Sequence, residues 1–173
     1  AFYGGGNAGP YRGSKFSMFE GGIRVPAIIR YPKEIPANEV REQLAMETDW
    51  FSTVADLANI DITGLKVDGK SLMPIIKNAK DDSQHETVYW QLGGYDDTTA
   101  QWVVRKGPWK LIGNVNEPLG EMKQKQMPEL FLVNLDEDIG EQNNLAETNP
   151  QKLNELLQLH DVWLKSVRDE MNK

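Results

Sequence analysis

Several residue types and segments that support common chemistries are missing from this 173-residue chain. It contains no cysteine, so disulfides, thiolate nucleophiles and cysteine-based zinc sites are excluded. Neither a G-x-S-x-G nor an H-E-x-x-H motif occurs, so a serine triad and zinc-protease chemistry of that type have no support. No apolar run approaches the ~18 residues that a membrane span needs. We therefore expect no membrane span.

The composition is that of a folded, acidic protein. Hydrophobic residues make up 39% of the chain and charged residues 26%, which are ordinary globular values. The net charge of −7 argues against a general nucleic-acid binder, because binding to phosphates needs a basic surface. Only two histidines are present; His85 lies in a polar stretch and His160 on an apolar helical stripe, so we expect structural roles for both.

The first part of the chain predicts a strand and helices. The apolar run 23–30 favours a buried strand, with Pro26 near its start. Residues 48–59 predict a helix, and residues 71–77 a short helical piece. The helix over 48–59 has one expected apolar face, formed by Trp50, Phe51, Val54, Leu57 and Ala58. The polar stretch 78–86 is the best internal boundary.

The second part predicts a sheet and a helix. Segments rich in aromatic and β-branched residues predict four strands, at 87–92, 101–106, 109–112 and 129–135. A terminal helix begins at Asn149-Pro150 and carries an apolar stripe that must be buried. The expected fold class is therefore α+β, with a four-stranded antiparallel sheet packed on one face by the long terminal helix.

The stretch Tyr11–Pro26 holds the first candidate site residues. Four isolated charges stand among its glycines and hydroxyls: Arg12, Lys15, Glu20 and Arg24. Cations beside glycines suit a small oxyanion such as sulfate or phosphate, because glycine lets the backbone approach a ligand closely. The alternative is a surface loop that leads into a buried strand.

A second candidate is the loop at 93–99, which contains Asp96 and Asp97 between two predicted strands. Loops at the end of a sheet often reach into a neighbouring cleft, so this pair could lie beside a substrate. The alternative is an exposed hairpin loop.

Six stretches, in order, resemble the C-terminal part of a sulfatase of the alkaline-phosphatase-like superfamily. The most specific are Arg12-Gly13-Ser14-Lys15, similar to the family's Arg-Gly-Gly-Lys, and Glu20-Gly21-Gly22-Ile23-Arg24-Val25-Pro26, similar to its Glu-Gly-Gly-Ile-Arg-Val-Pro. The other matching stretches are 49–58, 68–74, 104–112 and 129–146.

This resemblance implies roles for the candidates. Lys15 holds the position of the lysine that contacts the sulfate ester, while Arg12, Glu20 and Arg24 brace its loop. The substrate would be a sulfated small molecule or glycan, and the loops 93–99 and 114–126 are candidates for its recognition. Residues 1–78 would be the end of the catalytic α/β domain, and residues 79–173 the C-terminal subdomain.

The resemblance also implies a Ca²⁺ ion and a formylglycine, which the family makes from Cys or Ser in a Cys/Ser-x-Pro-x-Arg motif. That motif and the acidic metal pairs are absent from this sequence. We therefore expect the chain to be the C-terminal portion of a sulfatase and to be inactive alone. Its expected partners are the rest of the catalytic domain or further copies of itself, through the apolar edge at 23–29. Family resemblance indicates a periplasmic or secreted location.

Two other functions remain open at this point. One is a phosphoester or phosphonate hydrolase of the same superfamily. The other is a non-catalytic module that binds a substrate or a partner.

Overall fold

The computed structural model describes residues 7–117 and 127–172 and divides the chain into two units. The sheet unit consists of Ala1–Val25 and Thr87–Lys173, and the middle unit of Pro26–Glu86. The opening stretch is thus grouped with the C-terminal sheet. The assignment of residues 1–78 to a catalytic domain concerns the complete protein and stays a prediction.

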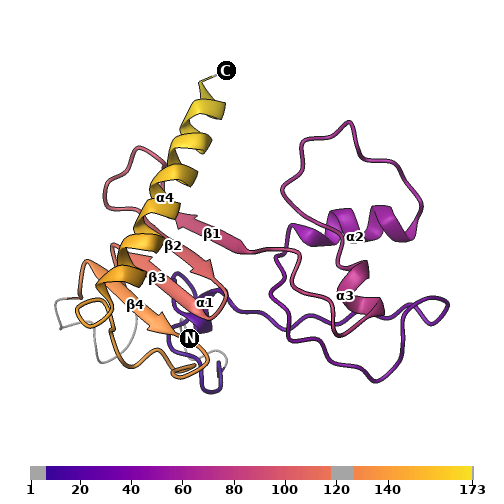
Figure 1. Ribbon diagram of the computed structural model, residues 1–173, viewed down its shortest axis with the longest axis horizontal. Coiled ribbons are helices and arrows are strands. Elements are labelled where there is room, and N and C mark those ends of the chain that lie inside the picture. The colour runs from indigo at the N-terminus through magenta and orange to yellow at the C-terminus, as the bar shows by residue number, and fades with distance from the viewer. Residues whose placement is uncertain (1–6, 118–126, 173) are drawn as a thin grey trace. The chain divides into compact units, whose positions relative to one another are not determined.

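The sheet unit contains the predicted four-stranded antiparallel sheet (Figure 1). Its strands are β1 (Thr87–Leu92), β2 (Gln101–Lys106), β3 (Trp109–Gly113) and β4 (Leu130–Asn134), in the order β1-β2-β3-β4. A two-residue turn joins β2 to β3, and Gly107 takes the left-handed conformation that this turn needs (φ 57°). The α+β fold class is confirmed.

Both faces of the sheet are buried. Helix α4 (Pro150–Met171) crosses one face, as predicted, and packs Leu156 against Val104, Leu111 and Leu132 (Figure 1). The side chains that alternate with these point to the other face, where the opening stretch covers them. That second cluster contains Met18, Phe19, Val103, Ile112, Val115, Phe131, Val133 and Leu135. From the sequence we predicted that the terminal helix covers one face, and we made no prediction of what covers the other.

The middle unit contains helices α2 (Asp49–Leu57) and α3 (Met73–Lys77). The prediction of the apolar face of α2 is wrong, because Phe51 and Val54 are 53% and 58% exposed. The buried positions of this helix are instead mostly polar.

These polar side chains satisfy the backbone of the segment that packs against α2. The Ser52 hydroxyl donates to the Gly69 carbonyl (2.7 Å). The backbone N–H of Leu72 donates to Thr53 Oγ1 (2.9 Å), and that of Lys70 to Asp49 Oδ1 (2.8 Å). A buried backbone group left without a partner is costly, so polar residues are the suitable ones here.

The strand predicted at 23–30 is also wrong. A short helix, α1 (Glu20–Ile23), ends where the strand should begin, and residues 24–30 form neither helix nor strand. Ile28 is 91% exposed and Val25 72%. A strand exists only through hydrogen bonds to a neighbour, and no strand among residues 7–117 and 127–172 pairs with this segment.

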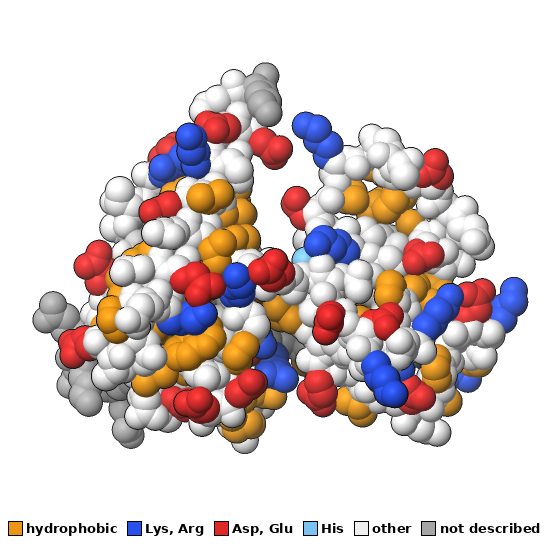
Figure 2. All heavy atoms as spheres, in the orientation of Figure 1, with side chains coloured by type: hydrophobic (Ala, Val, Ile, Leu, Met, Phe, Trp, Pro, Cys, Tyr) orange, Lys and Arg blue, Asp and Glu red, His pale blue; other side chains and the backbone are white. Residues whose placement is uncertain are grey.

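No helix within residues 7–117 and 127–172 is both long and apolar enough to cross a membrane. In the view of Figure 2, acidic and basic side chains are interspersed over the surface.

The exposed apolar segment 24–30 predicts self-association of the isolated chain. Size-exclusion chromatography with light scattering should show oligomers that increase with concentration, since an uncovered apolar segment favours intermolecular pairing. Ile28→Glu should shift the chain towards monomer. Val162→Glu, at a 70% exposed position on α4, is the control and should not. A monomeric wild-type chain at all concentrations would contradict this prediction.

Candidate functional site

The stretch from Tyr11 to Arg24 folds into a compact loop that only glycine permits at two positions. A Cβ on Gly21 would lie 2.5 Å from the Gly13 carbonyl oxygen, and one on Gly22 would lie 2.0 Å from the Ser17 carbonyl oxygen. The N–H of Gly21 donates to the Arg12 carbonyl at 2.6 Å. The two adjacent glycines are therefore required for the loop to close on itself.

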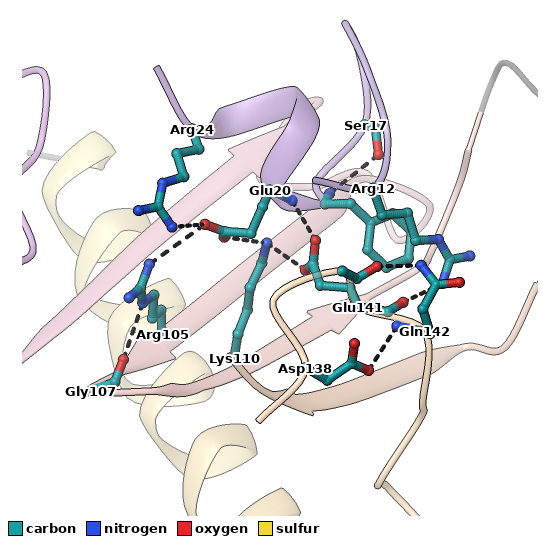
Figure 3. Close-up of polar contacts among 12 residues, drawn as sticks. Arg12, Ser17, Glu20, Arg24, Arg105, Gly107, Lys110, Asp138, Glu141 and Gln142 are labelled. Atoms are coloured by element: carbon teal, nitrogen blue, oxygen red, sulfur yellow. Dashed lines mark hydrogen bonds and ion pairs between the residues drawn. The ribbon is translucent and has the colours of Figure 1, made fainter. Parts of the chain in front are cut away.

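A buried ion cluster holds this loop to the sheet. It consists of Glu20, Lys110 and Glu141, which are 2%, 0% and 0% exposed. Figure 3 shows that the Lys110 side chain extends from β3 and ends between the two carboxylates. Its Nζ lies 2.8 Å from Glu20 Oε1 and 2.9 Å from Glu141 Oε1. Glu141 Oε2 also accepts the backbone N–H of Glu20 at 2.6 Å.

Two arginines add positive charge on the side of Glu20. Arg24 Nη1 and Arg105 Nη1 lie 3.6 and 3.8 Å from Glu20 Oε2 (Figure 3). Burial lowers the pKa of Arg105 and raises the pKa of Glu141, because a low-dielectric site disfavours the charged form of both groups; Lys110 opposes the shift at Glu141.

Arg12 attaches the N-terminal end of the loop to Glu117 and to the Glu141 backbone. Its guanidinium lies 3.9 Å from the centre of the Phe19 ring and donates to the Glu141 carbonyl at 2.8 Å. It also forms an ion pair with Glu117 at 3.0 Å. Arg12, Glu20 and Arg24 are thus engaged by protein groups, and the bracing role expected for them stays a prediction.

Lys15 is placed differently. It lies in an exposed turn, and its Nζ lies 5.1 Å from the centre of the Phe16 ring. Within residues 7–117 and 127–172, no carboxylate lies at ion-pairing distance from Lys15. Its ammonium is therefore available to an anion.

Asp96 and Asp97 lie in the exposed loop between β1 and β2, and within residues 7–117 and 127–172 neither forms a hydrogen bond or ion pair with the Lys15 turn. Asp97 Oδ1 accepts the Thr99 hydroxyl (2.6 Å) and the Thr99 N–H (2.8 Å), and these hydrogen bonds lower the pKa of Asp97. The side chain of Asp96 is 97% exposed and lies 3.8 Å from Arg168. Asp97 therefore stabilises its own loop, and a substrate-binding role for the pair stays a prediction.

Two amide side chains that the sequence did not single out join the candidate segments. The Gln101 side chain donates to the Phe16 carbonyl (3.3 Å) and accepts the N–H of Asn116 (3.1 Å). The Asn114 side chain donates to the carbonyls of Thr98 (2.8 Å) and Ala100 (2.9 Å). The Lys15 turn and parts of both predicted substrate loops are therefore connected; residues 118–126 of the second loop lie outside the described residues.

The described residues do not fit a metal ion. Residues 7–117 and 127–172 contain no cluster of three or more histidine, cysteine, aspartate or glutamate side chains that could hold one. Both histidines are engaged by packing or pairing, as expected. The His160 ring stacks on Trp102 (3.8 Å between centres), and burial lowers its pKa. His85 Nε2 lies 2.7 Å from Asp49 Oδ1.

Known proteins with similar sequences and folds define the class of this chain. The chain is a sulfatase segment of alkaline-phosphatase-like fold. It belongs to the family described as N-sulphoglucosamine sulphohydrolase, C-terminal, which matches residues 11–168. The predicted resemblance is confirmed.

Curated relatives agree with this assignment. A sulfatase from Formosa agariphila is 32% identical over 162 residues, which are 87% of this chain and 28% of the relative. An N-acetylgalactosamine-6-O-sulfatase from Bacteroides thetaiotaomicron is 30% identical over 92% of this chain and 30% of the relative. A mouse steryl-sulfatase is 35% identical over 61% of this chain and 17% of the relative. The chain thus spans less than a third of these proteins.

Solved structures share the fold. Ps i-CgsB in complex with k-i-k-neocarrahexaose superposes with a TM-score of 0.72 and 23% identity, over 90% of this chain and 32% of that chain. A protein in complex with its substrate, D-glucosamine-2-N,6-O-disulfate, superposes with a TM-score of 0.62 and 24% identity, over 82% of this chain and 28% of that chain.

The buried ion cluster predicts a large stability effect at Lys110. Lys110→Met should lower the free energy of unfolding by about 3–5 kcal/mol, because it leaves two buried carboxylates without their shared cation. Lys152→Met, which removes the half-exposed lysine paired with Glu155 at 2.6 Å, should change it by less than about 1 kcal/mol. Urea unfolding measures both, and equal effects would contradict the prediction.

The glycine pair gives a second prediction. Gly22→Ala should destabilise the protein by about 3 kcal/mol, because its Cβ would meet the Ser17 and Ser14 carbonyl oxygens at 2.0 and 2.6 Å. Gly64→Ala is the matched control; its Cβ would meet nothing within 4 Å, and we expect a change within about 0.5 kcal/mol. A neutral Gly22→Ala in thermal or urea unfolding would show that the loop closes differently.

Proposed function

We propose that the complete protein hydrolyses a sulfate ester of a small molecule or glycan, and that Lys15 contacts the sulfate. Membership of the sulfatase family supports the reaction class. The observation that carries the residue assignment is the exposed Lys15 ammonium, which has no carboxylate partner among the described residues, on a loop whose other charges are engaged.

Lys15 would act by electrostatics. An ammonium group is a compact point charge with three donors, so it can hold sulfate oxygens and oppose negative charge that develops as the ester bond breaks. Such a contact is most effective when the cation is positioned before the reaction. The buried ion cluster and the stacked Arg12 would provide that positioning, because they anchor the backbone on both sides of Lys15.

The family implies Ca²⁺ and a formylglycine. The residues described here do not supply a metal site, and the sequence contains no Cys/Ser-x-Pro-x-Arg motif, so in our proposal both groups reside in the remainder of the complete protein. The isolated chain would accordingly be inactive. Its contribution is one wall of the active site, and the remainder of the catalytic domain is its partner.

A sulfated sugar is the substrate class that we favour. One relative acts on N-acetylgalactosamine 6-O-sulfate by its name, and one structural neighbour binds D-glucosamine-2-N,6-O-disulfate as its substrate. The loops at 93–99 and 114–117 are the candidates for contacts to that sugar, because Gln101 and Asn114 connect them to the Lys15 turn.

Sulfate release by the full-length protein tests the role of Lys15. Lys15→Ala should lower kcat by about 10²–10³-fold, the scale of removing one oxyanion donor. Lys165→Ala, which removes an exposed lysine of α4, should leave kcat unchanged. An unchanged kcat in Lys15→Ala would overturn the assignment.

The same assay separates the rival functions. Faster turnover of a phosphate diester than of an aryl sulfate would favour a phosphoester or phosphonate hydrolase. Absence of turnover of either, with glycan binding intact in Lys15→Ala, would favour a non-catalytic module.

A further inference from the structure

Phe16 exposes a large aromatic ring at a strained position beside Lys15. The residue is 51% exposed, and its φ of 72° lies in the left-handed region that bulky side chains rarely adopt. The residues that follow, from Ser17 to Glu20, are all buried, so the turn cannot relax without moving them. Strain of this kind persists where the surroundings enforce it, and it concentrates at ligand-binding sites.

Gln101 connects this turn to a second exposed residue, Asn116. Gln101 is 6% exposed and is the first residue of β2, so its side chain is rigidly supported. It bonds the Phe16 carbonyl and the Asn116 N–H at the same time, at 3.3 and 3.1 Å. A single side-chain amide can reach both only if the Phe16 carbonyl and the Asn116 N–H lie close together.

Asn116 carries a carboxamide, and its backbone N–H bonds the same Gln101 side chain as the Phe16 carbonyl. Its residue is exposed, and its side chain forms no hydrogen bond within the described ranges 7–117 and 127–172. Its neighbours are fixed, because Val115 is buried in the core beneath the loop and Glu117 is paired with Arg12. The backbone that carries this free amide is therefore held in place.

We infer that Phe16 and Asn116 form a subsite for the sugar ring of a sulfated saccharide. The inference rests on the proposed contact between Lys15 and the sulfate. The Phe16 ring offers a negative π-face to the C–H bonds of a sugar ring, and the Asn116 amide can both donate to and accept from a hydroxyl. Lys15 Nζ lies 5.1 Å from the centre of the Phe16 ring, so the cation and the ring would contact adjacent parts of one small ligand.

Kinetics of the full-length protein can separate the contribution of the Phe16 ring from that of its backbone conformation. Phe16→Asn and Phe16→Gly remove the ring, and both residues accept the left-handed conformation. Phe16→Trp retains an aromatic face. The control is Phe51→Ala, which removes a ring that is 53% exposed on α2. The probes are N-acetylgalactosamine 6-sulfate and glucosamine 6-sulfate as substrates, a 4-nitrophenyl sulfate substrate, and inorganic sulfate as an inhibitor.

We expect Phe16→Asn, Phe16→Gly and Asn116→Ala to raise KM for the better sugar substrate, about ten-fold for the ring variants, which corresponds to ~1.4 kcal/mol. They should leave kcat and the inhibition constant of inorganic sulfate unchanged, because they remove contacts to the sugar alone. Phe16→Trp should retain the wild-type KM, and so should Phe51→Ala. Lys15→Ala, in contrast, should weaken inhibition by sulfate.

Several outcomes would overturn the inference while leaving the proposed function intact. One is hydrolysis of the aryl sulfate without hydrolysis of either sugar sulfate. Another is an unchanged KM in the Phe16 and Asn116 variants. A fall in kcat for all substrates, with reduced thermal stability, would show that Phe16 packs against the remainder of the protein. Absence of turnover of every sulfate ester would instead refute the proposed function itself.

Discussion

The ammonium group of Lys110 lies between two buried carboxylates from segments 121 residues apart in the chain. Taking three charges out of water costs several kcal/mol per ion, and only close pairing offsets that cost. Because Glu20 and Glu141 both need this cation, the opening stretch and the segment after β4 are fixed to the same point on β3. The arrangement specifies where the loop docks, and the two apolar clusters provide most of the stabilisation.

Because the loop docks on the sheet, both faces of the sheet are covered. Helix α4 covers one face, and the other carries the opening stretch, with Lys15 and Phe16 left at its exposed turn. Arg12, Glu20 and Arg24 are engaged by protein groups, whereas Lys15 has no carboxylate partner among residues 7–117 and 127–172. We propose that this frame positions the Lys15 ammonium group for electrostatic stabilisation of a sulfate ester.

Local patterns made much of this fold predictable. The strands β2 and β3 and the apolar stripe of α4 depend on neighbouring residues, and all were predicted correctly. The strand expected at 23–30 was wrong because a strand depends on a partner elsewhere. The face of α2 was wrong because its polar side chains bond a segment 17 to 21 residues away. In the candidate site, the isolated charges among glycines pointed to Lys15 and its neighbouring charges, and motif resemblance gave their roles. The roles of Lys110 and Gln101 could not be predicted from the sequence, because their partners Glu20 and Phe16 lie 90 and 85 residues earlier in the chain.

The most direct test is a crystal structure of the full-length protein with a bound sulfated ligand. The account predicts that Lys15 Nζ lies about 3 Å from a sulfate oxygen, within hydrogen-bond distance, while Lys110 remains between Glu20 and Glu141. A sulfate bound elsewhere, with Lys15 directed into solvent or paired with a carboxylate of the remaining domain, would contradict it.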